Sequence, residues 1–165
     1  MVPDIDLQLQ VAIKALSDAI APAVDPDDKM ATEQLQLVIA TLTMARERLP
    51  VERRMVRRLL EDDIALAERV AATVKDDGSM SVCIEGAKAA LADPELGTSE
   101  LAEARSELTN ETARMIREIG ADGVARLAPI IVEGSRVQLS RLRAWCLPSG
   151  FEPDPEAIPP LDALL

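Results

Sequence analysis

The scarcity of aromatic residues limits the folds open to this chain more than any other feature. Among its 165 residues, Trp145 and Phe151 are the only aromatic side chains, and tyrosine and histidine are absent. Apolar residues still make up 48% of the chain, so a core must be built mainly from Leu, Ile, Val, Ala and Met. These residues suit the packing of helix on helix better than the aromatic-rich surface of a sheet. The composition therefore favours an all-α fold.

Apolar residues recur at spacings of three and four along most of the chain, which is the pattern of amphipathic helices. In the first segment this stripe is Ile5, Leu9, Ala12, Leu16 and Ile20. Turn-forming residues separate the segments at Pro22, Pro50, Gly78, Pro94 and Gly120. We predict helices over residues 4–21, 26–49, 51–75, 79–92, 98–120 and 122–147. Short connections make neighbouring helices antiparallel, so we expect an up-and-down helical bundle of five to six helices.

Several local details of these helices follow from capping chemistry. Asp25 followed by Pro26 is typical of an N-cap with proline at the first helical position, and Ser79 can cap the fourth segment. Pro50 either starts a new helix after a corner or kinks one long helix. The last segment contains Pro129 and Gly134, and both a bent and a straight helix agree with its pattern.

The composition changes after Leu147. The last eighteen residues are rich in proline, contain four acidic residues and lack basic ones. We predict one helical domain over residues 1–147 and a Pro-rich, non-helical tail over residues 148–165. The tail acids, with the apolar anchors Phe151, Ile158, Leu161, Leu164 and Leu165, indicate a strap across the arginine-rich segment at residues 46–58 or across a neighbouring subunit. A disordered terminus is the alternative.

The net charge of −11 argues against several classes of partner. Such a chain repels polyphosphates at long range, so we expect no nucleic-acid or membrane binding. No apolar run approaches the ~18 residues that a membrane helix needs, and the first residues lack a basic secretory signal. Cys83 and Cys146 do not form a metal-binding or redox motif. We expect reduced, buried thiols in a cytoplasmic protein, with a disulfide as the alternative.

Catalytic chemistry has little support in the sequence. A general base is most often histidine, and there is none. Glu61, Asp62 and Asp63 lie mostly outside the apolar stripe of their helix, and other acids are scattered where exposure explains them. Glycine-rich phosphate loops are also missing. We therefore predict a non-enzymatic protein without catalytic residues, metal site or cofactor.

The strongest local signal is basic. Six arginines lie within thirteen residues of this acidic chain. One of them is Arg48, and the other five are the candidate anion-binding residues Arg46, Arg53, Arg54, Arg57 and Arg58. Converging guanidinium groups can bind phosphate or carboxylate bidentately. Alternatively, they form an exposed helix face with the pairs Arg57–Glu61 and Arg58–Asp62.

Two functional hypotheses remain. The first is a helical bundle that acts by protein–protein interaction, as an accessory or assembly subunit, with a homodimer or another protein as partner. Apolar stripes wider than one neighbouring helix would cover favour it. The second is a binder of a small anionic ligand, phosphorylated or acyl-carrying, at the arginine-rich corner.

Overall fold

The computed structural model describes residues 4–74 and 78–165, without the side chains of residues 121 and 122. Within these ranges the chain forms six α-helices and no strand, which confirms the predicted all-α helical bundle. The predicted turn residues Asp76 and Asp77 lie outside the described ranges. The residues group into two compact units, one formed by Met1–Val51 with Trp145–Ala157 and the other by Glu52–Ala144 with Ile158–Leu165. The predicted domain boundary after residue 147 stays a prediction.

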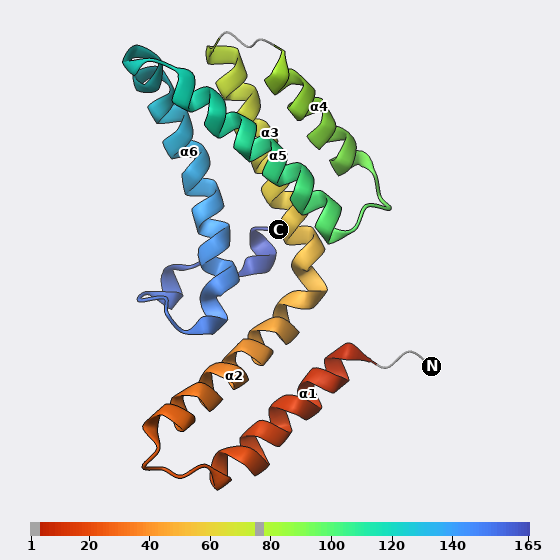
Figure 1. Ribbon diagram of the computed structural model, residues 1–165, viewed down its shortest axis with the longest axis vertical. Helices are drawn as coiled ribbons and strands as arrows, with labels where there is room; N and C mark the ends of the chain where they lie inside the picture. The colour runs from red at the N-terminus through yellow and green to blue at the C-terminus, as the bar shows by residue number, and fades with distance from the viewer. Residues whose placement is uncertain (1–3, 75–77) are drawn as a thin grey trace. The chain divides into compact units, whose positions relative to one another are not determined.

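The first unit is built around a hairpin of α1, Ile5–Ala15, and α2, Lys29–Arg48 (Figure 1). Asp4 caps α1 by accepting hydrogen bonds from the amides of Asp6 and Leu7. After Ala15 the chain continues through a π-helical turn, Leu16–Ile20, and a 3-10 turn, Ala21–Ala23, so the break at Pro22 lies where we predicted it.

The start of α2 differs from the prediction. Asp28, and not Asp25, caps the helix by accepting a 3.0 Å hydrogen bond from the amide of Ala31. Asp25 instead accepts from the amide of Asp27 inside the preceding turn. Both aspartates have suitable capping chemistry, and the turn that follows Pro26 delays the helix until the second one. Pro50 lies in a 3-10 turn, Leu49–Val51, between α2 and the next helix.

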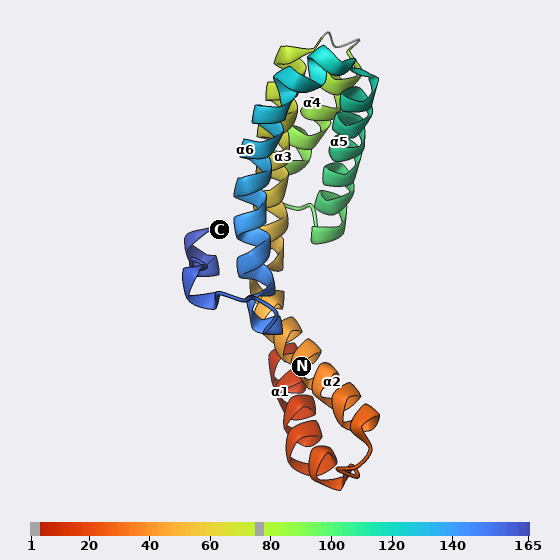
Figure 2. The ribbon, with the colours of Figure 1, turned by 90° about the vertical axis from the view of Figure 1, so that its left-hand side faces the viewer.

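Four further helices form the second unit and lie side by side (Figure 2). They are α3, Glu52–Thr73, α4, Ser79–Ala92, α5, Thr98–Glu118, and α6, Ala121–Cys146, of which the last two residues belong to the first unit. Their bounds agree with the predicted segments within a few residues. α6 runs through Pro129 without interruption. The connection before α4 ends at Gly78, whose φ of +100° is in the left-handed region that glycine tolerates best.

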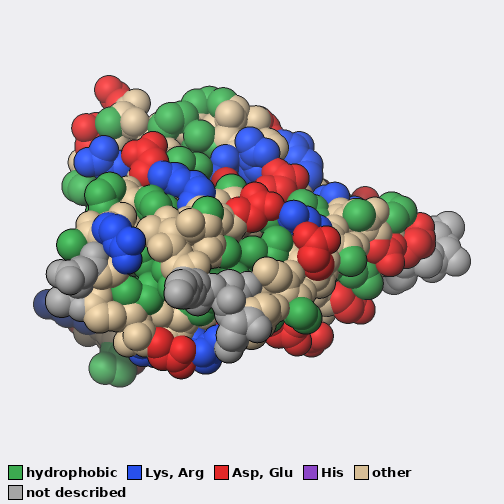
Figure 3. Space-filling view, turned by 90° about the horizontal axis from the view of Figure 1, so that it is seen from above, with side chains coloured by type: hydrophobic (Ala, Val, Ile, Leu, Met, Phe, Trp, Pro, Cys, Tyr) green, Lys and Arg blue, Asp and Glu red, His purple; other side chains and the backbone are tan. Residues whose placement is uncertain are grey.

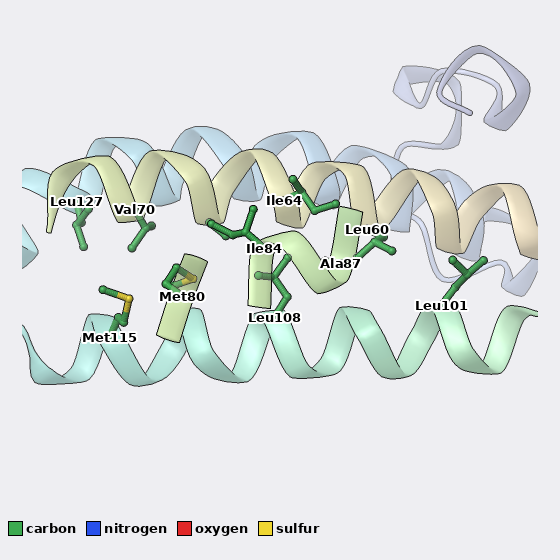
Figure 4. Packing of buried hydrophobic residues seen from close by; sticks show 11 residues of the cluster. Leu60, Ile64, Val70, Met80, Ile84, Ala87, Leu101, Leu108, Met115 and Leu127 are labelled. Carbon is green, nitrogen blue, oxygen red and sulfur yellow. The ribbon is translucent and has the colours of Figure 1, made fainter. Parts of the chain in front are cut away.

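The hydrophobic core cluster of the second unit consists of aliphatic side chains and methionines, as the composition requires (Figure 4). Leu60 and Val70 of α3, Leu108 of α5 and Leu127 of α6 are fully buried. The remaining members of this cluster are Ile64, Ala67, Met80, Ile84, Ala87, Leu101 and Met115. Burial of one such Leu or Val side chain contributes about 1.5–3 kcal/mol relative to exposure, so this cluster is the main source of stability for the unit.

The C-terminal residues form no α-helix, but they are not wholly irregular. Short 3-10 turns occur at Leu147–Ser149, Pro155–Ala157 and Leu161–Ala163, which corrects the prediction of a non-helical tail. Proline prevents longer helices here, whereas a single 3-10 turn needs only one or two amide donors. The last eight residues belong to the second unit, where Ile158 is buried.

Candidate functional site

The arginines of the candidate anion site divide between the two units. Arg46 lies in the first, where its guanidinium makes a bidentate contact with Asp6 of α1, the shorter bond being 2.7 Å. This hydrogen bond lowers the pKa of Asp6. Arg48 donates to the carbonyl of Trp145 and lies over its ring. Both arginines therefore join α2 to other segments of their own unit.

Arg53 and Arg57, one helical turn apart on α3, bind the C-terminal end of α4. Arg53 donates to the carbonyls of Pro94 and Leu96, and Arg57 donates a 2.6 Å hydrogen bond to the carbonyl of Leu91. The last carbonyls of a helix have no partner within it, so cationic donors stabilise them. Arg57 therefore acts as an external C-cap for α4, and Arg53 binds the segment that follows the helix.

Arg54 and Arg58 lie on the exposed side of α3. Arg54 pairs with Asp162 of the tail at 3.3 Å, and Arg58 pairs with Glu61 at 2.6 Å. The predicted pairs Arg57–Glu61 and Arg58–Asp62 do not form. Arg57 turns to α4 instead, which leaves Glu61 to Arg58. Exposed pairs of this kind contribute about 0–1 kcal/mol each.

Each candidate arginine thus has a partner within its own unit, although one donor group stays unmatched. The Nη1 atom of Arg57 is buried and has no hydrogen-bond partner among the described residues. On the face seen in Figure 3, basic side chains lie beside acidic ones. Whether the segment binds an anion stays a prediction.

Two carboxylates that we placed outside the apolar stripe are in fact inside the second unit. Asp63 of α3 is only 5% exposed and accepts hydrogen bonds from Arg105 of α5 and Gln138 of α6. Asp62 pairs with Arg141 of α6, itself a buried residue that also donates to the carbonyl of Leu164. Burial raises the pKa of Asp62, and the Arg141 guanidinium opposes the rise.

This polar network was missed because its basic members lie on other helices. A buried charge costs several kcal/mol unless it is paired, and the pairing is invisible from the pattern of one helix. The one available signal was Arg141, which stands within the apolar residues of α6. Glu111 was likewise assigned to the surface, yet it accepts hydrogen bonds from Ser79 and Arg114 between α4 and α5. Ser79 therefore does not cap α4, and Gly78 occupies the N-cap position.

The thiols are less buried than we predicted. Cys83 is half-buried and Cys146 is exposed, and no disulfide joins them. Cys146 is at the end of α6, where few side chains cover it. The described residues also contain no group of three or more acidic or cysteine side chains positioned to hold a metal ion. No helix in these ranges is long and apolar enough to cross a membrane.

Exposed apolar side chains occur in both units. In the first unit, none of the described residues is buried, and α1, the π-helical turn after it and α2 expose large apolar side chains. These are Ile5, Leu7, Val11, Ile20, Met30, Leu37 and Val38. In the second unit, α6 exposes Val132, Leu139 and Leu142 beside a shallow groove of about 470 Å³.

The exposure of α6 corrects the predicted core stripe of this helix. The sequence predicts a core stripe of Val124, Leu127, Ile131, Ser135, Leu139, Leu142 and Trp145, of which Leu127 is buried as predicted. Ser135, Leu139 and Leu142 are exposed, however, and Arg141, which lay outside this stripe, is buried. α6 is apolar on two sides, and periodicity alone does not say which side faces the neighbouring helices. Comparisons with protein-family models, with curated proteins and with solved structures found no match. The surfaces described above are therefore the basis for assigning a function.

Proposed function

We propose that this protein acts by protein–protein contact, as a non-enzymatic accessory or assembly subunit that forms a homodimer. The observation that carries the proposal is the α1–α2 hairpin, which has apolar faces but no buried residue. Met30 is 74% exposed and Ile5 is 63% exposed. Isolated pairs of helices gain too little from burial to be stable, because most helical stability comes from tertiary packing. A partner that covers the outer faces would supply the missing burial.

The chemistry of the chain supports a non-enzymatic role. The buried carboxylate Asp63 is paired with Arg105, and Asp62 is paired with Arg141. Side chains tied in ion pairs of this kind hold helices together and are poorly available as proton carriers. A cytoplasmic location is part of the proposal, because two widely separated cysteines without a CxxC motif are typical of reduced thiols.

Sedimentation velocity over a hundredfold concentration range tests the proposal. We expect the sedimentation coefficient to rise with concentration to that of a dimer. A double variant, Leu7→Glu with Leu37→Glu, should shift this transition to at least tenfold higher concentration, because both side chains are exposed and apolar. Gln8→Glu with Gln36→Glu, which adds the same charge at exposed polar positions, is the matched control. A strict monomer at every concentration would contradict the proposal.

The anion-binding alternative is supported by one observation, the unmatched Nη1 of Arg57. A phosphate or carboxylate oxygen would satisfy this donor. Thermal-shift measurements with inorganic phosphate and acetyl phosphate test this alternative. A rise in Tm that disappears in the double variant Arg54→Ala with Arg57→Ala, but persists in Arg69→Ala on the same helix, would favour ligand binding over assembly.

A further inference from the structure

An exposed row of uncharged residues runs along α6 with the spacing of a coiled-coil seam. Its members follow one another at intervals of three and four residues and are all exposed. We call this row the α6 seam, and it comprises Ala125, Ala128, Val132, Ser135, Leu139 and Leu142. Alternation of three and four keeps side chains on one side of a helix, where a partner helix can pack between them.

We propose that a second copy of this chain docks on the α6 seam, with the two α6 helices antiparallel. The inference rests on the proposed self-association and adds the α6 seam to the α1–α2 hairpin as a second surface of contact. Among the described residues nothing covers the seam, whose members Val132 and Leu139 are 52% and 56% exposed. Such a row of apolar side chains on one helix is a common form of partner site.

The order of side-chain sizes selects the antiparallel orientation. The seam begins with the small residues Ala125 and Ala128 and ends with the large residues Leu139 and Leu142. In an antiparallel pair, Leu142 of one copy faces Ala125 of the other, and Leu139 faces Ala128. Every layer then contains one large and one small side chain, which fills space evenly. A parallel pair would place leucine against leucine at one end and alanine against alanine at the other.

The groove beside the seam fits the same arrangement. It is about 470 Å³ in volume and opens where Ser135 stands between the larger Val132, Leu139 and Leu142. In the antiparallel register, Val132 of the second copy is opposite Ser135 and enters this hollow. When a side chain of one helix enters a hole between side chains of the facing helix, the two make the knobs-into-holes contact of paired helices.

Charge complementarity supports a second copy as the occupant. The seam itself carries no charge, and on its solvent side lie Glu133 and Arg136, neither of which has an ion-pair partner among the described residues. In the antiparallel register, Arg136 of one copy comes within about one helical turn of Glu133 of the other. Two such pairs form around the two-fold axis, because a symmetric contact repeats each interaction.

The size of the seam limits what this surface can contribute to the dimer. Its members span eighteen residues, or about 27 Å of helix. One helix face of this length covers less than the ~800 Å² per partner of a standard interface. We therefore expect a reversible dimer that dissociates on dilution.

Sedimentation velocity on the full chain tests the surface. Leu139→Glu with Leu142→Glu should move the monomer–dimer transition to at least tenfold higher concentration, with an unchanged circular dichroism spectrum. Val82→Glu, at an apolar α4 position that is 73% exposed, is the matched control and should behave as the wild type. A seam variant that still dimerises, while the hairpin variant Leu7→Glu with Leu37→Glu does not, would overturn this inference and leave the proposed function standing. A wild-type monomer would overturn both.

Disulfide cross-linking tests the orientation. Ala128→Cys and Leu139→Cys proteins are prepared separately in a Cys146→Ser background. After mild oxidation, the mixture should give a cross-linked dimer between residues 128 and 139, identified by mass spectrometry, whereas neither protein alone should give one. Cross-linking of each protein with itself would overturn the antiparallel arrangement.

Discussion

Arg105 of α5 donates a 2.6 Å hydrogen bond to Asp63 of α3, and the two form an ion pair at the margin of an otherwise apolar core. The side chain of Asp63 is 5% exposed and that of Arg105 is 32% exposed. The carboxylate therefore depends on the protein for its partners, whereas the guanidinium can reach water. Loss of the Arg105 guanidinium and loss of the Asp63 charge should therefore lower the free energy of unfolding by different amounts.

Removal of Arg105 should be more harmful than neutralisation of Asp63. Arg105→Met leaves a buried carboxylate with Gln138 as its main partner, and we expect a loss of about 3 kcal/mol in the free energy of unfolding. Asp63→Asn leaves Arg105 free to turn to solvent, and we expect a loss of about 1 kcal/mol. Urea denaturation followed by circular dichroism measures both. Arg117→Met, at an exposed position of α5, is the control, and equal losses for the first two variants would contradict the argument.

The tail contributes to stability through one apolar anchor. Ile158 is buried in the second unit, so Ile158→Ala should lower the free energy of unfolding by about 2 kcal/mol. Phe151→Ala removes a larger side chain that is 82% exposed and should have little effect. Thermal denaturation of both variants checks this prediction. A larger loss for Phe151→Ala would show that the tail packs differently.

Two glycines at the start and in the middle of α4 should respond oppositely to alanine. Gly78 has a φ of +100°, which an L-residue adopts only with strain, so Gly78→Ala should cost at least about 1 kcal/mol. Gly86 is helical and a Cβ there would meet no atom within 4 Å. Gly86→Ala should therefore stabilise the protein by about 0.5–1 kcal/mol. Chemical denaturation shows whether each variant raises or lowers the free energy of unfolding. A stabilising effect of Gly78→Ala would contradict the backbone geometry.

The two faces of α3 should differ in how much their arginines contribute. Arg53→Ala removes the donor for two carbonyls after α4 and should cost about 1–2 kcal/mol. Arg54→Ala removes an exposed pair with Asp162 and should cost about 0.5 kcal/mol or less, an effect that 0.5 M salt should abolish. Denaturation curves at two salt concentrations separate the two cases. A salt-sensitive loss for Arg53→Ala would argue against its role in holding the segment after α4.

The pKa of Asp62 should lie above the usual value of 3.8, and the pKa of Asp6 should lie below it. Burial raises the pKa of Asp62, whereas the Arg46 hydrogen bond lowers the pKa of Asp6. The contribution of Asp62 to the free energy of unfolding is thus fully present below its pKa in the unfolded chain, and it is lost as pH rises through its higher pKa in the folded protein. The contribution of Asp6 is fully present above its pKa in the unfolded chain, and it is lost as pH falls through its lower pKa in the folded protein. Carbon-13 NMR of the carboxyl groups checks the order, and an Asp62 midpoint below that of Asp6 would contradict it.

Much of the secondary structure could be predicted from local patterns. The bounds of α4 and the start of α5 follow from turn residues that act within a few positions of themselves. The N-cap of α2 was predicted wrongly as Asp25, because Asp28 can accept the same kind of hydrogen bond and the turn after Pro26 delays the helix. The candidate arginines were equally ambiguous, since a guanidinium at a given position can reach an acid on its own helix or a carbonyl on another.

The sequence by itself determined that the chain is helical and that its core is aliphatic, because spacing and composition are local properties. The tertiary structure decided what those helices bury. It placed Asp63 inside and Leu139 outside, and it directed Arg53 and Arg57 to the end of α4. The contacts behind these outcomes join residues at least 34 positions apart in the sequence. Arg57 contacts Leu91, and Asp63 contacts Arg105 and Gln138. A periodic stripe records that a helix has an apolar side, but the approach of distant segments decides which side is covered.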